Sequence, residues 1–500
     1  MRRAMPLILA LPLSLAIRAP VEAKAWPQTP GRTSIPAALR QAGLDTYWRT
    51  QVTLEHGERI DKMYAMEENL YLLTDRHRVI VISAASGLRK WTHSFGRRLG
   101  KLYRPCHGAG VLLSETPPGV EKIVTPPDLR ALKAYNVVFF NTPNCAIALD
   151  RETGKQLRKM DFSVRPDEFT ATTGGACDGE YFYVGASNGR CYSIQVNAGI
   201  IAWILRTGDM MTAAPHCQKA GETRRVFFAG EDSELHVAQA GSLLSTIWPP
   251  AGTRTWPAMA GPVIAEFHVD DRACFIPCEE RRVYAFSLAG GNPIWRFSCK
   301  GPLLDPIQVS ENTVFQYARG DKLYAINPAN GKLRWALPEG RRVLASMPLN
   351  DTPTAYLVDR SGNLLVVDEI LGKVSASVRL KGCQLFADNT SAPAIYVAGR
   401  AGRVYCLRHL GAPHLSEDVL RKTPSGKAEP KKAEPKKPEP KMPKPRKAEP
   451  KETEPKEAEP KKVAPKKIPP KKVAPKKVKP KRVKPRRARP KKAKPGPNPF

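Results

Sequence analysis

Hydrophobic and polar residues alternate with a period of two over most of residues 45–410. Such alternation is typical of half-buried β-strands, and turn residues bound each short run. Eight segments repeat one pattern of hydrophobic strand, polar turn, second alternating strand and closing glycine, the glycines being Gly87, Gly154, Gly199, Gly241, Gly291, Gly331, Gly372 and Gly411. No convincing helical periodicity interrupts them, so helices are expected to be rare.

The spacing of the closing glycines predicts the architecture. After a first gap of 67 residues, they follow one another at intervals of 39 to 50 residues. A repeat of this length, built from four short strands, is typical of a propeller blade. The last copy lacks a fourth strand, whereas residues 43–54, GLDTYWRTQVTL, have the missing form upstream. We therefore predict an all-β, eight-bladed β-propeller closed by its N-terminal strand.

An aromatic residue follows the closing glycine in several copies. A tryptophan on an outer strand can lay its apolar face on the next blade while its N–H finds a backbone acceptor. Trp248 comes late in its copy, and Arg158 and Ala376 replace the aromatic residue in two others. The tryptophans predicted to dock blades are Trp48, Trp91, Trp203, Trp295 and Trp335.

The repeat itself resembles a known unit. The segments DKLYAINPANGKLRW, RVYAFSLAGGNPIW and RCYSIQVNAGIIAW resemble the PQQ-like repeat of quinoprotein dehydrogenases and of BamB-like outer-membrane assembly factors. The resemblance covers roughly residues 45–411 and implies an eight-bladed propeller in which the five tryptophans dock neighbouring blades. WD40 repeats are disfavoured because no Trp-Asp dipeptide or Gly-His pair punctuates the copies.

The resemblance does not by itself imply a bound quinone or an enzyme. The related alcohol dehydrogenases typically carry a vicinal disulfide, calcium ligands and an aspartate base. No two cysteines are adjacent in this chain, and Asp209, Asp305 and Asp359 stand in no recognisable constellation. We therefore predict no catalytic, cofactor-binding or metal-binding residues and no cofactor. A PQQ-dependent oxidoreductase is the alternative.

Cysteine lies beside histidine in two places, PCHG at 105–108 and PHCQ at 215–218. Neighbouring residues on a strand face opposite ways, so each pair would offer at most one metal ligand. We expect these cysteines to be structural. Cys274 and Cys278 could form a disulfide only if their segment turns, and the pairing of the ten cysteines stays open.

The N-terminus has the form of a secretory signal. Two arginines precede an apolar run at 6–17, and the small residues Ala23 and Ala25 mark a cleavage site. We predict export to the periplasm or cell envelope; an apolar helix of a cytosolic protein is the alternative. No later segment is long and apolar enough to span a membrane. The predicted parts are a signal peptide (1–25), a linker (26–44), the propeller (45–415) and a disordered tail (416–500).

The tail carries most of the charge. Residues 421–500 hold 31 Lys+Arg and 8 Asp+Glu, a net of +23 within a total of +33, and proline recurs at every fifth position from Pro430 to Pro495. Such a segment cannot build a core and favours polyproline II. The acid-free distal half is the predicted polyanion-binding region: Lys461, Lys462, Lys466, Lys467, Lys471, Lys472, Lys476, Lys477, Arg486, Arg487, Lys491 and Lys492.

These features predict an exported, non-enzymatic scaffold for protein–protein interaction with a function in the cell envelope. An unidentified protein partner is expected at the propeller face or loops, including the proline-rich excursion at 108–136. The tail is expected to bind an anionic envelope polymer or lipid. Its alternatives are a solvated spacer and a non-specific nucleic-acid binder, without sequence-specific recognition because aromatic residues are not interleaved. We expect a monomer.

Overall fold

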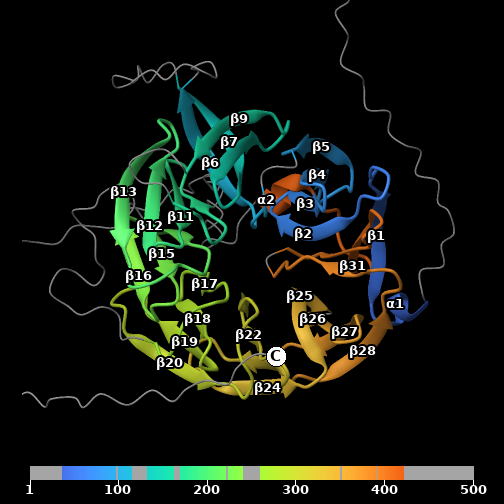
Figure 1. Ribbon diagram of the computed structural model, residues 1–500. Helices are drawn as coiled ribbons and strands as arrows, with labels where there is room; N and C mark the ends of the chain where they lie inside the picture. The colour runs from blue at the N-terminus through green and yellow to red at the C-terminus, as the bar shows by residue number, and fades with distance from the viewer. Residues whose placement is uncertain are drawn as a thin grey trace, which may run out of the picture. The chain divides into compact units, whose positions relative to one another are not determined.

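The computed structural model describes residues 37–96, 100–114, 132–162, 169–220, 223–239, 259–349, 352–390 and 392–421. Within these ranges, eight antiparallel sheets surround a common axis (Figure 1). The predicted all-β, eight-bladed propeller is therefore confirmed. The helices of this part of the chain are short: α1 (Ala37–Gln41) and α2 (Glu417–Arg421).

Blades 1 to 4 follow the chain, and each begins with its innermost strand. Blade 4 has three strands in the described part of the chain, which stops at 239 and resumes at 259. The strands of the four blades are β2 (Ile60–Met66), β3 (Asn69–Thr74), β4 (Arg78–Ser83) and β5 (Arg89–Ser94); β6 (Cys106–Ser114), β7 (Leu132–Asn141), β8 (Cys145–Asp150) and β9 (Gln156–Asp161); β10 (Ala176–Cys177), β11 (Tyr181–Gly185), β12 (Arg190–Gln195) and β13 (Ile200–Arg206); β14 (His216–Ala220), β15 (Thr223–Ala229) and β16 (Leu235–Gln239).

Blades 5 to 8 repeat the same order, and each has four strands. Their strands are β17 (His268–Val269), β18 (Cys274–Cys278), β19 (Arg282–Phe286) and β20 (Pro293–Ser298); β21 (Gln308–Val309), β22 (Val314–Tyr317), β23 (Leu323–Ile326) and β24 (Leu333–Leu337); β25 (Gly340–Leu349), β26 (Thr352–Asp359), β27 (Asn363–Asp368) and β28 (Val374–Arg379); β29 (Leu385–Phe386), β30 (Ile395–Ala398), β31 (Arg403–His409) and β1 (Leu44–Gln51).

The N-terminal strand completes the last blade, as predicted. β1 pairs antiparallel with β31, from Leu44 opposite His409 to Gln51 opposite Arg403. Blade 8 therefore combines residues separated by more than three hundred positions, and this pairing ties the two ends of the propeller together.

Antiparallel blades give the propeller two different faces. The turns from first to second strand and from third to fourth strand lie on one face, and the remaining turns and the connections between blades lie on the other. Glu417 of α2 accepts a hydrogen bond from Ser83, which ends the third strand of blade 1 (2.7 Å). We therefore call the first face the α2 face and the second the opposite face.

Two segments differ from or refine the sequence expectations. The excursion at 108–136 begins and ends in regular structure, because β6 and β7 pair as far as Ser114 opposite Leu132; its paired prolines lie outside the described residues. Cys274 and Cys278 lie on one strand that pairs with β19 throughout, so this segment does not turn. All ten cysteines are free thiols.

Apolar packing between blades forms the core. All six residues of β3, for example, are buried. Phe315 and Trp335 of blade 6 pack with Val343 and Leu357 of blade 7 in one buried cluster. Burying each such side chain stabilises the fold by about 1.5–3 kcal/mol. Neighbouring blades therefore stabilise one another through these buried apolar contacts.

Candidate functional site

Four of the five predicted tryptophans make the same contact with the following blade. The indole Nε1 donates to a backbone carbonyl three residues before that blade's closing glycine. The pairs are Trp48 to Ala84 (3.1 Å), Trp91 to Arg151 (2.7 Å), Trp295 to Pro328 (2.7 Å) and Trp335 to Glu369 (2.8 Å). Each indole is also largely buried, so the contact joins apolar area to one directional bond.

The other two observed cases show how the contact varies. Trp203 is buried beside Val226 and Phe228 of blade 4, but its Nε1 has no acceptor among the described residues. In blade 2, Arg158 occupies the aromatic slot, and its Nη1 donates to the carbonyl of Val196 at 3.0 Å. Val196 stands three residues before Gly199. A guanidinium therefore reaches the same acceptor, which the sequence pattern alone did not predict.

The closing glycines serve this contact as well as the turn. Gly372 has a φ of +73°, and a Cβ placed there would lie 2.4 Å from Trp335. Gly331 stands in the same relation to Trp295, at 2.7 Å. Only glycine tolerates both the left-handed backbone and the close approach of the ring. The closing glycine of one blade and the tryptophan of the preceding blade therefore form a single inter-blade contact.

A cavity of about 520 Å³ lies at the axis, where the inner strands converge. The two Cys-His pairs of the sequence meet in its wall, because an inner strand presents its edge to the axis. Its thiol and imidazole lining comprises Cys106, His107, Cys177, His216, Cys217 and His268. Residues from four consecutive blades, far apart in sequence, are therefore brought to one site that spacing could not reveal.

Burial keeps several of these thiol and imidazole groups uncharged. It raises the pKa of Cys177 to about 12 and holds the pKa of Cys106 and Cys217 well above the ordinary value. Burial, with the nearby His268, lowers the pKa of His216 to about 3. At neutral pH these groups are thiols and an uncharged imidazole. These thiols therefore offer weak hydrogen-bonding groups, and their burial disfavours the thiolate form.

Arginine–carboxylate pairs border the cavity. Arg104, which precedes the inner strand of blade 2, donates to Glu266 of blade 5 at 2.7 Å. Arg342 and Asp388 pair between blades 7 and 8 at 2.7 Å. Blades 2 and 5 are not neighbours, so the first pair spans the axis. Both of its side chains are partly exposed, so its contribution to stability is modest.

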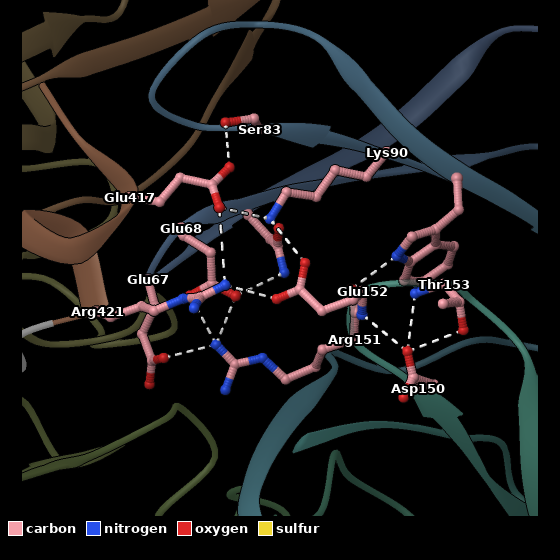
Figure 2. A network of polar contacts seen from close by, with 12 residues as sticks. Glu67, Glu68, Ser83, Lys90, Asp150, Arg151, Glu152, Thr153, Glu417 and Arg421 are labelled. Atoms are coloured by element: carbon pink, nitrogen blue, oxygen red, sulfur yellow. Dashed lines mark hydrogen bonds and ion pairs between the residues drawn. The ribbon is translucent and has the colours of Figure 1, made fainter. Parts of the chain in front are cut away.

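Helix α2 borders the cavity on the α2 face, where Val419 and Leu420 form part of its lining. Figure 2 shows the polar contacts that hold the helix. Glu417 accepts from Ser83 (2.7 Å) and pairs with Lys90 (3.1 Å), and Arg421 pairs with Glu152 (2.5 Å). Leu420 is 6% exposed. Both apolar burial and charge thus anchor the last turn before residue 422.

Beneath α2 lies a buried ion network. Glu68 has no exposed surface, and both of its oxygens lie 2.7 Å from Nη2 of Arg151, which is 4% exposed. The same Nη2 contacts Glu67 at 2.7 Å, and Nε of Arg421 lies 3.5 Å from Glu68. Two carboxylates from blade 1 therefore share an arginine from blade 2, and Arg421 of α2 lies beside them (Figure 2).

The network continues to the cavity wall through His107. Its Nε2 lies 2.8 Å from the hydroxyl of Tyr71, and its Nδ1 lies 3.7 Å from Glu67. Burial would raise the pKa of Glu67, but the nearby imidazole of His107 and the charge of Arg151 outweigh it and lower the pKa to about 2. A path of polar contacts therefore links α2 to the axial cavity.

The acidic residues considered as possible catalytic groups interact with neighbouring groups. Asp305 faces Arg319, Asp359 caps a turn through the amides of Ser361 and Asn363, and Asp209 accepts from its neighbouring amide. Sequence reasoning missed one cluster, Asp232, Glu234 and His236, whose ligand atoms lie within 4.8 Å of one another. His236 already pairs with Asp232 at 2.5 Å, and Asp232 also accepts from backbone amides.

Exposed apolar side chains gather at one topological position. Among the described residues, nearly all the large exposed hydrophobic side chains lie at the turn from third to fourth strand or at the start of the fourth strand. We call this set the apolar ring: Leu88, Ile200, Ile294, Leu333, Leu371, Val374 and Leu410. Leu371 is 73% exposed and Leu88 63%. Because these turns share a face, the ring surrounds α2 on the α2 face.

The predicted polyanion-binding residues, Lys461 to Lys492, lie outside the described residues, as do the signal peptide and most of the linker. No helix in the described ranges is long and apolar enough to cross a bilayer.

The fold and the inter-blade joints define an eight-bladed β-propeller. A family model described as outer membrane protein assembly factor BamB matches residues 239–425. Among solved structures, BamB from Moraxella catarrhalis is similar over 74% of this chain and 99% of that chain, with 14% identity and a TM-score of 0.50. The computationally designed Ika8 protein matches over 73% and 100%, with 12% identity and a TM-score of 0.49. No curated protein matches the sequence.

The resemblance inferred from the repeats is thereby confirmed. The family model supports it for residues 239–425, and the BamB crystal structure supports it for the fold.

Proposed function

We propose that the chain is an exported, non-enzymatic β-propeller scaffold that binds another protein in the cell envelope. The apolar ring is the observation that carries the proposal. Single exposed apolar residues are ordinary, but recurrence around one face provides a surface whose burial would favour association. The description of the matching family as an outer-membrane assembly factor and the secretory pattern of residues 1–25 support the envelope as its location.

The ring can be tested by capture from an envelope fraction. Full-length protein carrying Leu333→Ser, Leu371→Ser and Val374→Ser should lose a partner that the unmodified chain retains. A control variant with Ser187→Ala and Ser361→Ala, both exposed on the opposite face and outside the apolar ring, should retain it. Equal capture by the two variants would remove the ring from the proposal.

The enzymatic alternative needs its own experiment. The full-length protein would be incubated with pyrroloquinoline quinone and calcium, and dye reduction would be measured with alcohols and sugars. We expect no reduction above that of the free quinone. Substrate-dependent reduction of the dye would contradict the scaffold proposal and show that the protein is a quinone-dependent oxidoreductase.

We further propose that the distal tail binds anionic polymers or lipids of the envelope. Its charge supports this, since polycations bind polyanions with a steep dependence on salt. Deleting 461–500 should reduce retention on anionic vesicles at low salt and flatten the salt dependence. Unchanged retention would assign the tail the role of a solvated spacer, and a preference for DNA over vesicles would favour a nucleic-acid binder.

A further inference from the structure

A second cavity, also of about 520 Å³, opens on the opposite face at blade 8. We call it the seam pocket because it lies where the N-terminal strand completes the ring. Three loops form it: residues 52–59, which lead from blade 8 to blade 1; residues 380–384, which enter blade 8; and residues 399–402, the turn between β30 and β31.

Backbone contacts fix these loops to one another. The amides of Val52 and Ile60 donate to the carbonyls of Gly402 and Arg400, each at 2.9 Å. The amide of Gln384 donates to Ala398 at 3.0 Å. A Cβ at Gly399 would lie 2.6 Å from the carbonyl oxygen of Gly382. The loops therefore pack at a distance that only glycine allows, and the pocket is formed before any ligand arrives.

The pocket is strongly basic. Arg59, Lys381, Arg400 and Arg403 line it, and all four are exposed. The acidic residue in its lining, Glu58, is buried and pairs with Arg78 at 2.8 Å.

Few nearby acids neutralise these cations. Asp61 lies 4.0 Å from Arg400, and within the described residues the side chains of Arg59, Lys381 and Arg403 form no ion pair. Glu55, on the same connection, pairs with Arg76 and Arg78. Asp75 accepts from the backbone amide of Arg59 and not from its guanidinium. The local acids are thus engaged away from the pocket.

We propose that the seam pocket binds an acidic segment of a partner protein. Guanidinium groups bind carboxylates through paired hydrogen bonds, and clustered cations steer anionic partners to a surface. Three loops distribute the cations around a cavity large enough for several side chains, which favours a segment with repeated carboxylates over a single small anion. The inference rests on the proposed scaffold function, but it concerns the face opposite the apolar ring.

Direct binding tests the pocket. A fluorescein-labelled peptide of alternating Asp/Glu and Gly/Ser would be titrated with the full-length protein, and its anisotropy recorded at low and moderate salt. Lys381→Glu with Arg403→Glu should weaken binding about tenfold, because two attractive contacts become repulsive. The control, Arg206→Glu with Arg296→Glu, changes exposed outer-strand residues of blades 3 and 5, carries the same net charge and keeps the same tail.

The control should change affinity less than twofold, and both variants should melt like the unmodified protein. Equal weakening by the two variants would overturn the proposal, because the peptide would then be responding to net charge. If the pocket variant unfolds, Lys381→Gln with Arg403→Gln replaces it, with a smaller loss expected and no loss overturning the proposal.

Two further ligands identify the class of partner. Inorganic phosphate should compete weakly, and a hexuronate oligosaccharide of matched charge should compete less well than unlabelled peptide. If the oligosaccharide binds more tightly than the peptide, and if this binding also depends on Lys381 and Arg403, the ligand of the pocket is an acidic glycan and not a protein. If the unmodified protein does not bind the peptide but ring-dependent capture is intact, the seam-pocket proposal alone is overturned. Pocket-dependent peptide binding without ring-dependent capture would remove the ring alone.

Discussion

The junction of blades 1 and 2 and the junction of blades 6 and 7 share the same contact between tryptophan and backbone, which we call the frame, but they differ in the side-chain contacts added to it. In both, a tryptophan donates to the residue three before the next closing glycine, Arg151 in one case and Glu369 in the other. Both acceptor residues have buried side chains. Arg151 meets two carboxylates, whereas Glu369 accepts from the hydroxyls of Ser310 and Ser346.

The difference separates the repeat from the specific features of the chain. The frame uses only the backbone carbonyl at this position, so the side chain is free to vary. At blades 6 and 7 this side chain is Glu369, which accepts hydrogen bonds from two hydroxyl groups within the junction. At blades 1 and 2 the side chain at this position forms a buried ion network that also reaches α2 (Figure 2). Features particular to this protein therefore arise at positions where the repeat uses only the backbone and does not constrain the side chain.

The largest expected effect is the loss of Arg151. Arg151→Met would leave Glu68 buried without its main partner, and breaking such a pair costs about 3–5 kcal/mol. Denaturant unfolding of the full chain should show this loss. Glu369→Gln, which keeps the shape and an acceptor oxygen, should cost only about 1 kcal/mol. Equal losses would mean that the two junctions do not differ energetically.

The second prediction concerns the joint that both junctions share. Gly372→Ala adds a left-handed backbone penalty of about 1–2 kcal/mol and an overpacking cost of about 1–3 kcal/mol against Trp335. Gly362 is the matched control, since its φ is +81° and its added Cβ would meet nothing within 4 Å. Gly362→Ala should show the backbone penalty alone. Similar melting temperatures for the two variants would contradict the close fit of glycine and tryptophan.

The frame was predictable because its causes are local and repeated. Alternation, turn residues and the spacing of closing glycines sufficed for eight blades, and the form of residues 43–54 sufficed for closure by β1. The replacement of tryptophan by Arg158 was visible in the sequence, but its bond to Val196 depends on the reach of a guanidinium across a blade junction.

The candidate sites were less predictable because they depend on contacts between distant residues. Cys106, Cys177 and Cys217 meet at the axis only once the inner strands converge. Glu68 and Arg151 are 83 positions apart, and neither belongs to a motif. The apolar ring was the most accessible of these features, since its members flank the closing glycines; exposure, however, can be known only from packing.

The third prediction is a dependence on pH at the first junction. The pKa of Glu67 is lowered from 4.5 to about 2 in the folded chain. The unfolded chain therefore binds a proton at higher pH than the folded one, so this contribution is complete above about pH 4.5 and is lost as pH falls toward 2. Glu67 is about one-third exposed, so we expect a moderate effect. Melting temperatures between pH 6 and 2.5 should fall less steeply for Glu67→Gln than for the unmodified chain; parallel curves would exclude Glu67 as the source.

The smallest effect on overall stability is expected at α2, because the helix contributes only one edge of the cavity. Leu420→Ser removes its buried anchor and should favour local opening by about tenfold, with little change in melting temperature. Cys177 lines the cavity and should react faster with a maleimide, as measured by mass spectrometry. Cys191, buried between blades 3 and 4, should not. Val419→Ser is the control, since Val419 is half exposed on the same helix. Faster labelling of both cysteines would indicate that the blades themselves have loosened. The contacts of α2 would then stabilise the whole propeller and not only the local position of the helix.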